Sequence, residues 1–187
     1  DQAAIVRDTA YPTVMVLPQQ GLTTSAGVVT GLRRFAEKVG KPIVLYIKYG
    51  DFITVEGARQ LVDDGIISWI KYAIVREDPK VDPYLKELLD QVDPALIVSG
   101  IGEQPVIDHL VGFGVNGFTA GCVCVRPDLS AELLRAVQKG DLSRAREMRC
   151  GEVVLRRGSV LTPQDIGLLA TVGRAQLSVL PRPAVAV

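Results

Sequence analysis

Lys71 is the residue of this chain whose setting best suits covalent chemistry. It ends the mostly apolar run 66–71, a pattern typical of a buried strand. Lysine is rarely buried without a reason, and parallel sheets bind ligands at the carboxyl ends of their strands. A desolvated, neutral amine there can attack a carbonyl carbon and form a Schiff base. The alternative is an ordinary lysine whose ammonium group reaches past the strand end into water.

Two side chains of the preceding apolar run fall close to the same edge of the predicted sheet. Tyr46 holds the place equivalent to Lys71, where a phenol can relay protons to and from an imine. A tyrosine of the hydrophobic core is the alternative. Lys48 lies two residues further on and competes with Lys71 as the reactive amine, although the turn-like residues 49–51 favour its exposure.

Two glycine-containing segments follow later strands at this edge. Ser99 and Gly100 end the fourth apolar run, and Thr119 lies within residues 117–121 of the fifth. Glycines let a substrate approach the backbone, whose amides can hold a carboxylate or phosphate. The alternative is that both segments only make turns.

The cysteines and the single histidine form no metal-ligand pattern. One residue separates Cys122 from Cys124, whereas zinc pairs usually have two to four between them. We expect these two cysteines on one face of a buried strand and His109 as a surface or half-buried residue of an amphipathic helix. Three charged doublets are typical of solvated faces or turns: residues 33–34, 63–64 and 156–157.

Composition excludes several classes of partner. Lys+Arg and Asp+Glu balance at 21 each, and aromatic residues make up only 5% of the chain. Nucleic-acid or anionic-membrane binding would need a basic surface, and base stacking would need more aromatic residues. No apolar run is long enough to cross a bilayer. The odd cysteine count, with no secretory signal, predicts a cytoplasmic protein.

The elements that must position these residues alternate regularly. Apolar runs predict strands at 13–17, 42–47, 66–71, 95–98 and 117–123, and amphipathic spacing predicts helices between and after them. Ser25 and Thr54 are the expected caps of the first two helices. Continuous apolar strands separated by helices predict a parallel α/β sheet with five βα units. The pattern changes at about residues 149–151, where we place a domain boundary before a small β-rich segment.

The order of these motifs resembles the dihydrodipicolinate synthase / N-acetylneuraminate lyase family over residues 1–149. The motifs are Leu45-Tyr46, Ile70-Lys71, Ser99-Gly100 and the glycine-bounded segment 117–121, followed by helices from residue 127 to 145. The resemblance implies a (β/α)₈ TIM-type barrel that acts as a class I lyase or aldolase on pyruvate or another 2-keto acid. Lys71 would form the imine and Tyr46 would shuttle protons. Ser99, Gly100 and Thr119 would line the substrate site, and no metal or organic cofactor is implied.

The chain departs from that family in its number of units. Five βα units are present where a complete barrel has eight and about 250 residues. The missing units are the amino-terminal ones, which in the family carry a Thr- or Ser-rich turn that grips the substrate carboxylate. Thr23-Thr24-Ser25 comes too late in the order to be that turn. We therefore predict a partial barrel.

Residues 150–187 resemble part of the molybdopterin molybdenumtransferase family instead. The resemblance rests on residues 151–155, 161–163 and 166–170 and implies no functional residue. Three hypotheses result. The chain is a Schiff-base lyase, or a non-catalytic half-barrel that forms a homo-oligomer through its open edges, or a fragment associated with molybdenum-cofactor assembly.

Overall fold

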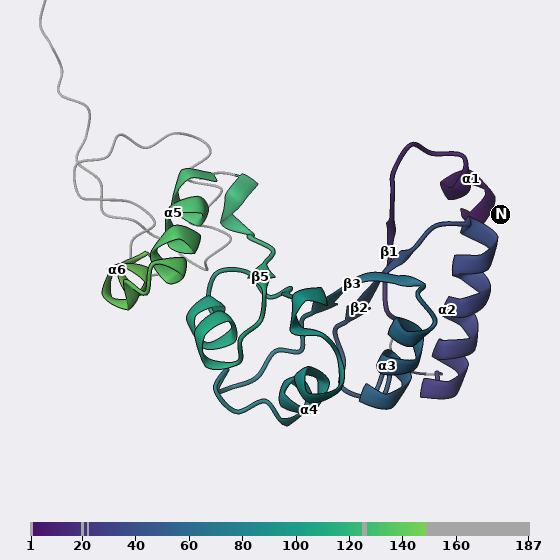
Figure 1. The fold of residues 1–187 in the computed structure, drawn as a ribbon, viewed down its shortest axis with the longest axis horizontal. Helices are drawn as coiled ribbons and strands as arrows, with labels where there is room; N and C mark the ends of the chain where they lie inside the picture. The colour runs from purple at the N-terminus through teal and green to yellow at the C-terminus, as the bar shows by residue number, and fades with distance from the viewer. Residues whose placement is uncertain (1, 20, 22, 125–126, 149–187) are drawn as a thin grey trace, which may run out of the picture.

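The computed structural model describes residues 2–19, 21, 23–124 and 127–148, which form one parallel sheet beside a row of helices (Figure 1). The strands pair in sequence order, each parallel to the next. This order confirms the predicted α/β layout with five parallel strands. The strands are β1 (Val14–Val16), β2 (Ile43–Ile47), β3 (Ile67–Tyr72), β4 (Ile97–Ser99) and β5 (Gly117–Phe118).

Three helices connect the first four strands: α2 (Ser25–Val39), α3 (Val55–Asp63) and α4 (Pro83–Gln91). Thr24, not the predicted Ser25, caps α2, since its hydroxyl accepts the Gly27 amide and Ser25 already lies in the helix. The Ser25 hydroxyl instead lies 3.0 Å from that of Thr54. Thr54 caps α3 as predicted. The two helix starts are thereby tied together.

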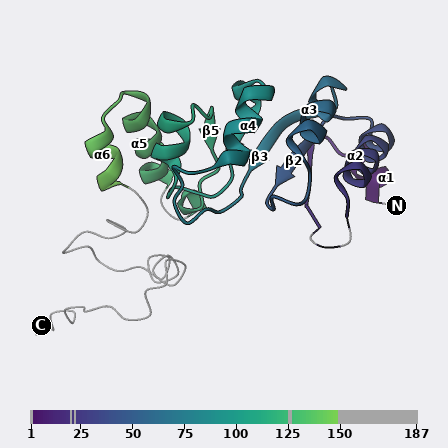
Figure 2. The same ribbon diagram turned by 90° about the horizontal axis from the view of Figure 1, so that it is seen from below.

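The two faces of the sheet differ in what covers them. Helices α2, α3 and α4 pack side by side against one face (Figures 1 and 2). The strand side chains on that face join a single core, which includes Ile43, Leu45, Ile70, Tyr72 and Ile97. Alternation along the strands sends the intervening side chains to the opposite face. No helix of the described residues covers that face.

The chain after β4 departs most from the predicted elements. A 3₁₀ turn, η1 (Pro94–Leu96), replaces the start of the predicted fourth strand, and a π-helix, η2 (Asp108–Gly112), lies where an amphipathic α-helix was predicted. β5 ends at Phe118, and residues 122–124 form the 3₁₀ turn η3 instead of continuing the strand. A short unpredicted helix, α1 (Gln2–Arg7), packs on α2.

Two further helices follow β5: α5 (Pro127–Gln138) and α6 (Leu142–Glu147). They form a second, smaller core with residues of the segment after β4, including Val106 and Ile107. The predicted domain boundary and every element predicted between residues 150 and 187 lie outside the described residues.

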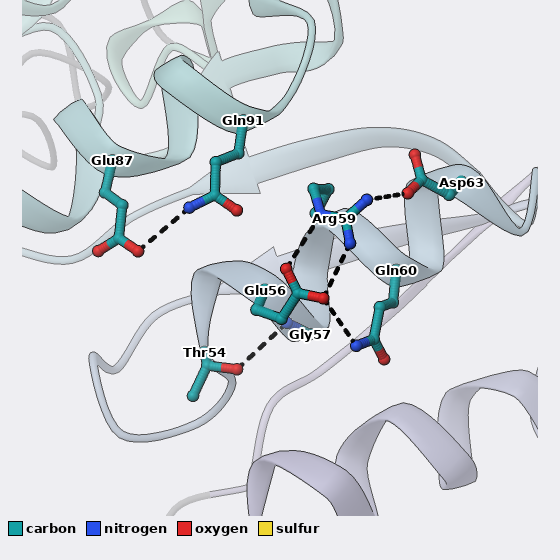
Figure 3. A network of polar contacts seen from close by, with 8 residues as sticks. All are labelled: Thr54, Glu56, Gly57, Arg59, Gln60, Asp63, Glu87 and Gln91. Atoms are coloured by element: carbon teal, nitrogen blue, oxygen red, sulfur yellow. Dashed lines mark hydrogen bonds and ion pairs between the residues drawn. The ribbon is translucent and has the colours of Figure 1, made fainter.

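The outer surfaces of α3 and α4 carry solvated charges. Arg59 bridges Glu56 and Asp63, and Glu87 accepts a hydrogen bond from Gln91 one turn along α4 (Figure 3). The hydrogen bond from Arg59 holds the pKa of Glu56 at about 2. Such exposed pairs contribute little to stability. They agree with the solvated role predicted for residues 63–64.

Candidate active site

Lys71 and Tyr46 lie side by side at the carboxyl end of the sheet. The parallel register pairs Tyr46 of β2 directly with Lys71 of β3. Both side chains are half-buried on the face that no described helix covers. The Lys71 Nζ lies 4.6 Å from the centroid of the Tyr46 ring, which is cation–π distance. The structure thus brings together two residues that the sequence placed at equivalent strand ends.

Gly100 packs directly against the Lys71 side chain. The Gly100 amide donates to the Tyr72 carbonyl at 2.6 Å, which holds the backbone after β4 against the end of β3. A Cβ atom at this position would lie 2.6 Å from Lys71 Cγ, 2.8 Å from Lys71 Cε and 3.0 Å from Ala73 Cβ. These distances are well below van der Waals contact. Only glycine therefore leaves room for the lysine chain in this position.

No described residue pairs with the amine of Lys71. Within residues 2–124 and 127–148, as far as they are described, Lys71 forms neither a hydrogen bond nor an ion pair. A carboxylate beside it would compete with an incoming carbonyl group for the nitrogen. Lys48, the competing amine, is exposed beyond the end of β2, with its Nζ 5.8 Å from the Tyr49 ring centroid. The two lysines therefore differ in burial: Lys48 is exposed, whereas Lys71 is half-buried on the sheet face.

Ser99 lies on the opposite face from Lys71. Its hydroxyl is fully buried and lies 2.8 Å from Nδ1 of His109, on the side covered by helices. His109 is itself only 1% exposed, so the prediction of a surface or half-buried histidine was wrong. Burial lowers the pKa of this imidazole. The Ser99 side chain therefore cannot contact a substrate on the Lys71 side of the sheet, and only its backbone can do so.

The loops after β4 and β5 are joined to each other. The Thr119 amide donates to the Ser99 carbonyl at 2.8 Å, and the Thr119 hydroxyl lies 3.5 Å from the same oxygen. Glu103, which the sequence analysis did not single out, is buried and accepts hydrogen bonds from the amides of Gly121 and Cys122 and from the Ser130 hydroxyl. A carboxylate that follows a strand-ending glycine turn was the signal that could have identified it.

A buried polar cluster lies behind the site, on the helix side of β3. Asp82 accepts hydrogen bonds from the Tyr72 hydroxyl, from Nη2 of Arg76 and from the Leu85 amide. Burial, with the hydrogen bond to Asp82, raises the pKa of Tyr72. The cluster borders a cavity of about 40 Å³ between the loops after β3 and β4. It fixes the end of β3 from which Lys71 projects.

The cysteines do not form the predicted buried strand face. Residues 122–124 are a 3₁₀ turn in which Cys124 is exposed, because the strand ends five residues earlier than predicted. In the part of the chain that the structure describes, no group of three or more His, Cys, Asp and Glu side chains could hold a metal ion. Among the same residues, no helix is long and apolar enough to cross a membrane.

Comparison with known proteins identifies the fold. No family model and no curated protein sequence matches the chain. Among solved structures, dihydrodipicolinate synthase from Oceanobacillus iheyensis aligns with a TM-score of 0.64 and 21% identity over 89% of this chain. Dihydrodipicolinate synthase DapA-2 from Bacillus anthracis aligns with a TM-score of 0.69 and 17% identity over 96% of this chain.

A third similar structure is YagE from E. coli K12, a prophage protein of the dihydrodipicolinic acid synthase family solved in complex with pyruvate. It aligns with a TM-score of 0.60 and 18% identity over 87% of this chain. The present chain spans 65% of the length of the O. iheyensis protein, 66% of YagE and 70% of DapA-2. The five-stranded sheet therefore matches a partial TIM-type barrel, as predicted. The predicted molybdopterin molybdenumtransferase resemblance of residues 150–187 is not supported by these comparisons.

Proposed function

We propose that this chain is a divergent member of the dihydrodipicolinate synthase / N-acetylneuraminate lyase family whose Lys71 forms a Schiff base with a 2-keto acid. The observation that carries the proposal is the position of the Lys71 side chain. Its side chain crosses Gly100, its Nζ lies over the Tyr46 ring, and no described residue bonds to the amine. The likeness of the fold to YagE, solved with pyruvate, supports pyruvate as the first substrate to test.

The proposed chemistry begins with attack of the neutral Lys71 Nζ on the C2 carbonyl carbon of the keto acid. The carbonyl oxygen gains a proton and later leaves as water, so that a C=N bond replaces the C=O bond. Tyr46 is the proposed proton relay, since its ring lies beside the nitrogen at which these transfers occur. The backbone at Gly100 and Thr119 would line the substrate site. Cleavage or formation of a carbon–carbon bond would proceed from this imine, as in a class I aldolase.

Reductive trapping tests the proposal. The chain is incubated with pyruvate and sodium borohydride, and the modified lysine is located by peptide mass spectrometry. The expected result is one reduced pyruvate adduct on Lys71, which Lys71→Met abolishes. Lys48→Met is the matched control, because Lys48 is the competing strand-end lysine and is exposed; this variant should keep the adduct. Equal labelling of several surface lysines, or none at all, would overturn the proposal.

The uncovered sheet face favours a second role, association of copies of this chain. Met15 on β1 is 39% exposed and Leu17, just after β1, is 69% exposed, and Trp69 lies half-buried on the same face as Met15. An apolar sheet face and the free edge of β1 are features that association would cover. We propose a homo-oligomer, catalytic or not. Sedimentation analysis should show a species larger than one chain, and Met15→Glu should dissociate it. A monomer at all concentrations would refute this role.

A further inference from the structure

We propose that Glu103 is the positioning residue of the Lys71 site, because its carboxylate closes the loop after β5 onto the loop after β4. The inference rests on the proposed function for the role of Lys71. It assigns to Glu103 a task that none of the strand-end residues performs. The charge of Glu103 does not act on the substrate. It acts through the backbone that lines the site.

The carboxylate of Glu103 is held as a bound ligand would be. One oxygen accepts the Gly121 amide at 3.1 Å, and the other accepts the Cys122 amide and the Ser130 hydroxyl, each at 2.9 Å. Glu103 is only 6% exposed. Successive backbone amides that point to one place form a natural anion site, and hydrogen bonds to a charged acceptor are the stronger kind. Three elements thereby meet on one side chain: the β4 loop, the β5 loop and α5.

The approach of the two loops depends on a left-handed glycine. Gly102 has φ of +100°, a conformation that side chains rarely adopt, and its Cβ position lies 4.0 Å from the Gly121 amide nitrogen. This turn directs Glu103 toward the β5 loop immediately after Gly100. Glu103 is therefore three residues from the glycine on which Lys71 rests.

The consequence for the site follows from this connection. Gly100 carries the Lys71 side chain, and Thr119 is bonded to the Ser99 carbonyl next to it. Without Glu103, the amides of Gly121 and Cys122 lose this acceptor, and the Thr119 contacts with Ser99 remain between the β5 loop and the β4 loop. We expect the pocket lining to loosen while the amine of Lys71 stays in place. Binding of the keto acid should then weaken more than imine formation at saturation.

The first test does not depend on the chemistry. Amide hydrogen exchange of Gly121 and Cys122 is measured in wild type, Glu103→Ala and Glu87→Ala, with a thiol reductant present. Glu87 is an exposed glutamate on α4 and serves as the matched control (Figure 3). We expect at least about a tenfold loss of protection at both amides in Glu103→Ala only. Added acetate, which can occupy the vacated site, should restore part of it, whereas chloride at equal ionic strength should not.

The second test measures trapping with pyruvate. In Glu103→Ala, the pyruvate concentration for half-maximal adduct should rise by about tenfold, while the adduct at saturation stays on Lys71 at the wild-type level. Absence of any adduct in the wild-type chain overturns the proposed function. Unchanged amide protection in Glu103→Ala overturns the positioning role whatever the trapping result, and so does lost protection with unchanged half-saturation.

A milder variant covers the case in which Glu103→Ala fails to fold. Ser130→Ala removes one of the three hydrogen bonds and leaves both amides bonded to the carboxylate. Amides of β2 and β3 report whether the sheet is intact. With the sheet intact, a smaller rise in half-saturating pyruvate together with faster exchange at Cys122 supports the role. No change in either measurement overturns it.

Discussion

Substitution of Gly100 by alanine should displace Lys71 with little loss of stability. The new Cβ would lie 2.6 Å from Lys71 Cγ and 2.8 Å from Cε. Carbon atoms in good contact are about 3.5–4.0 Å apart, so the lysine chain must move by about 1 Å or more. Gly100 is not among the glycines with positive φ, so alanine can adopt its backbone conformation. The strain therefore falls on the position of the lysine and not on the backbone.

The two observable effects of Gly100→Ala should differ greatly in size. Lys71 is flexible and half-exposed, so most of the overlap is relieved by moving it, and we expect about 1 kcal/mol or less of lost unfolding free energy. A misplacement of about 1 Å at a reacting group can cost on the order of 100-fold in rate. We therefore expect the initial rate of borohydride-trapped adduct formation to fall by about that factor.

Trapping at subsaturating pyruvate, with urea denaturation of the same samples, measures both effects. Gly117→Ala is the matched control, because Gly117 is a strand glycine of the same sheet whose Cβ would meet nothing within 4 Å. This control should keep the wild-type rate within about twofold. Wild-type trapping by Gly100→Ala would refute the conclusion that Gly100 sets the position of Lys71. An equal loss in both variants would show a general effect of added volume on the sheet.

Three further predictions concern the surroundings of the site. Tyr46→Phe keeps the ring beside Lys71 and removes the hydroxyl, so the rate of trapping should fall by about 10²–10⁴-fold if the phenol relays protons, with the adduct still on Lys71; an unchanged rate would remove Tyr46 from the mechanism. The chain has a single histidine, and burial lowers the folded-state pKa of His109 although Asp82 and Asp108 oppose the shift. Unfolding free energy should therefore be lost as pH falls from about 7.5 to about 5.5, by at most about 1.4 kcal/mol per pH unit, and His109→Gln should flatten this slope in urea titrations. Asp82→Ala leaves the buried Tyr72 hydroxyl and the partly exposed Arg76 without their acceptor, so urea denaturation should show a loss of about 1–3 kcal/mol; a loss under about 0.5 kcal/mol would contradict the buried network.

The sequence predicted the parallel sheet because hydrophobic periodicity reports burial directly. Strands β2 and β3 are buried on the helix face and carry long apolar runs, so their ends could be placed within a residue or two. Lys71 and Tyr46 then followed from their positions at those ends. Their contact required the register, which pairs the two residues and which no local pattern contains. The distance between them likewise depends on the packing of the folded sheet.

The errors cluster after β4, where tertiary contacts replace local pattern. Residues 122–124 look like a strand by composition. In the structure, however, the amides of Gly121 and Cys122 donate hydrogen bonds to Glu103 and not to a neighbouring strand. Ser99 was predicted to line the substrate site because it ends a strand, and this role stays a prediction for its backbone. The alternation of side chains turns its hydroxyl to His109 instead. Each error concerns a polar partner distant in sequence, which periodicity does not report.

Steric fit, more than electrostatics, fixes the amine of Lys71. A cation–π contact between half-buried side chains such as Lys71 and Tyr46 is worth about 0.5–2 kcal/mol, and it would weaken when the lysine loses its proton, as the proposed reaction requires. The close packing of the lysine chain on Gly100 is independent of charge and persists through both states. An imine that is protonated regains the attraction of the Tyr46 ring. In the proposed reaction, the packing on Gly100 is therefore the contact that would position the amine at the moment of attack.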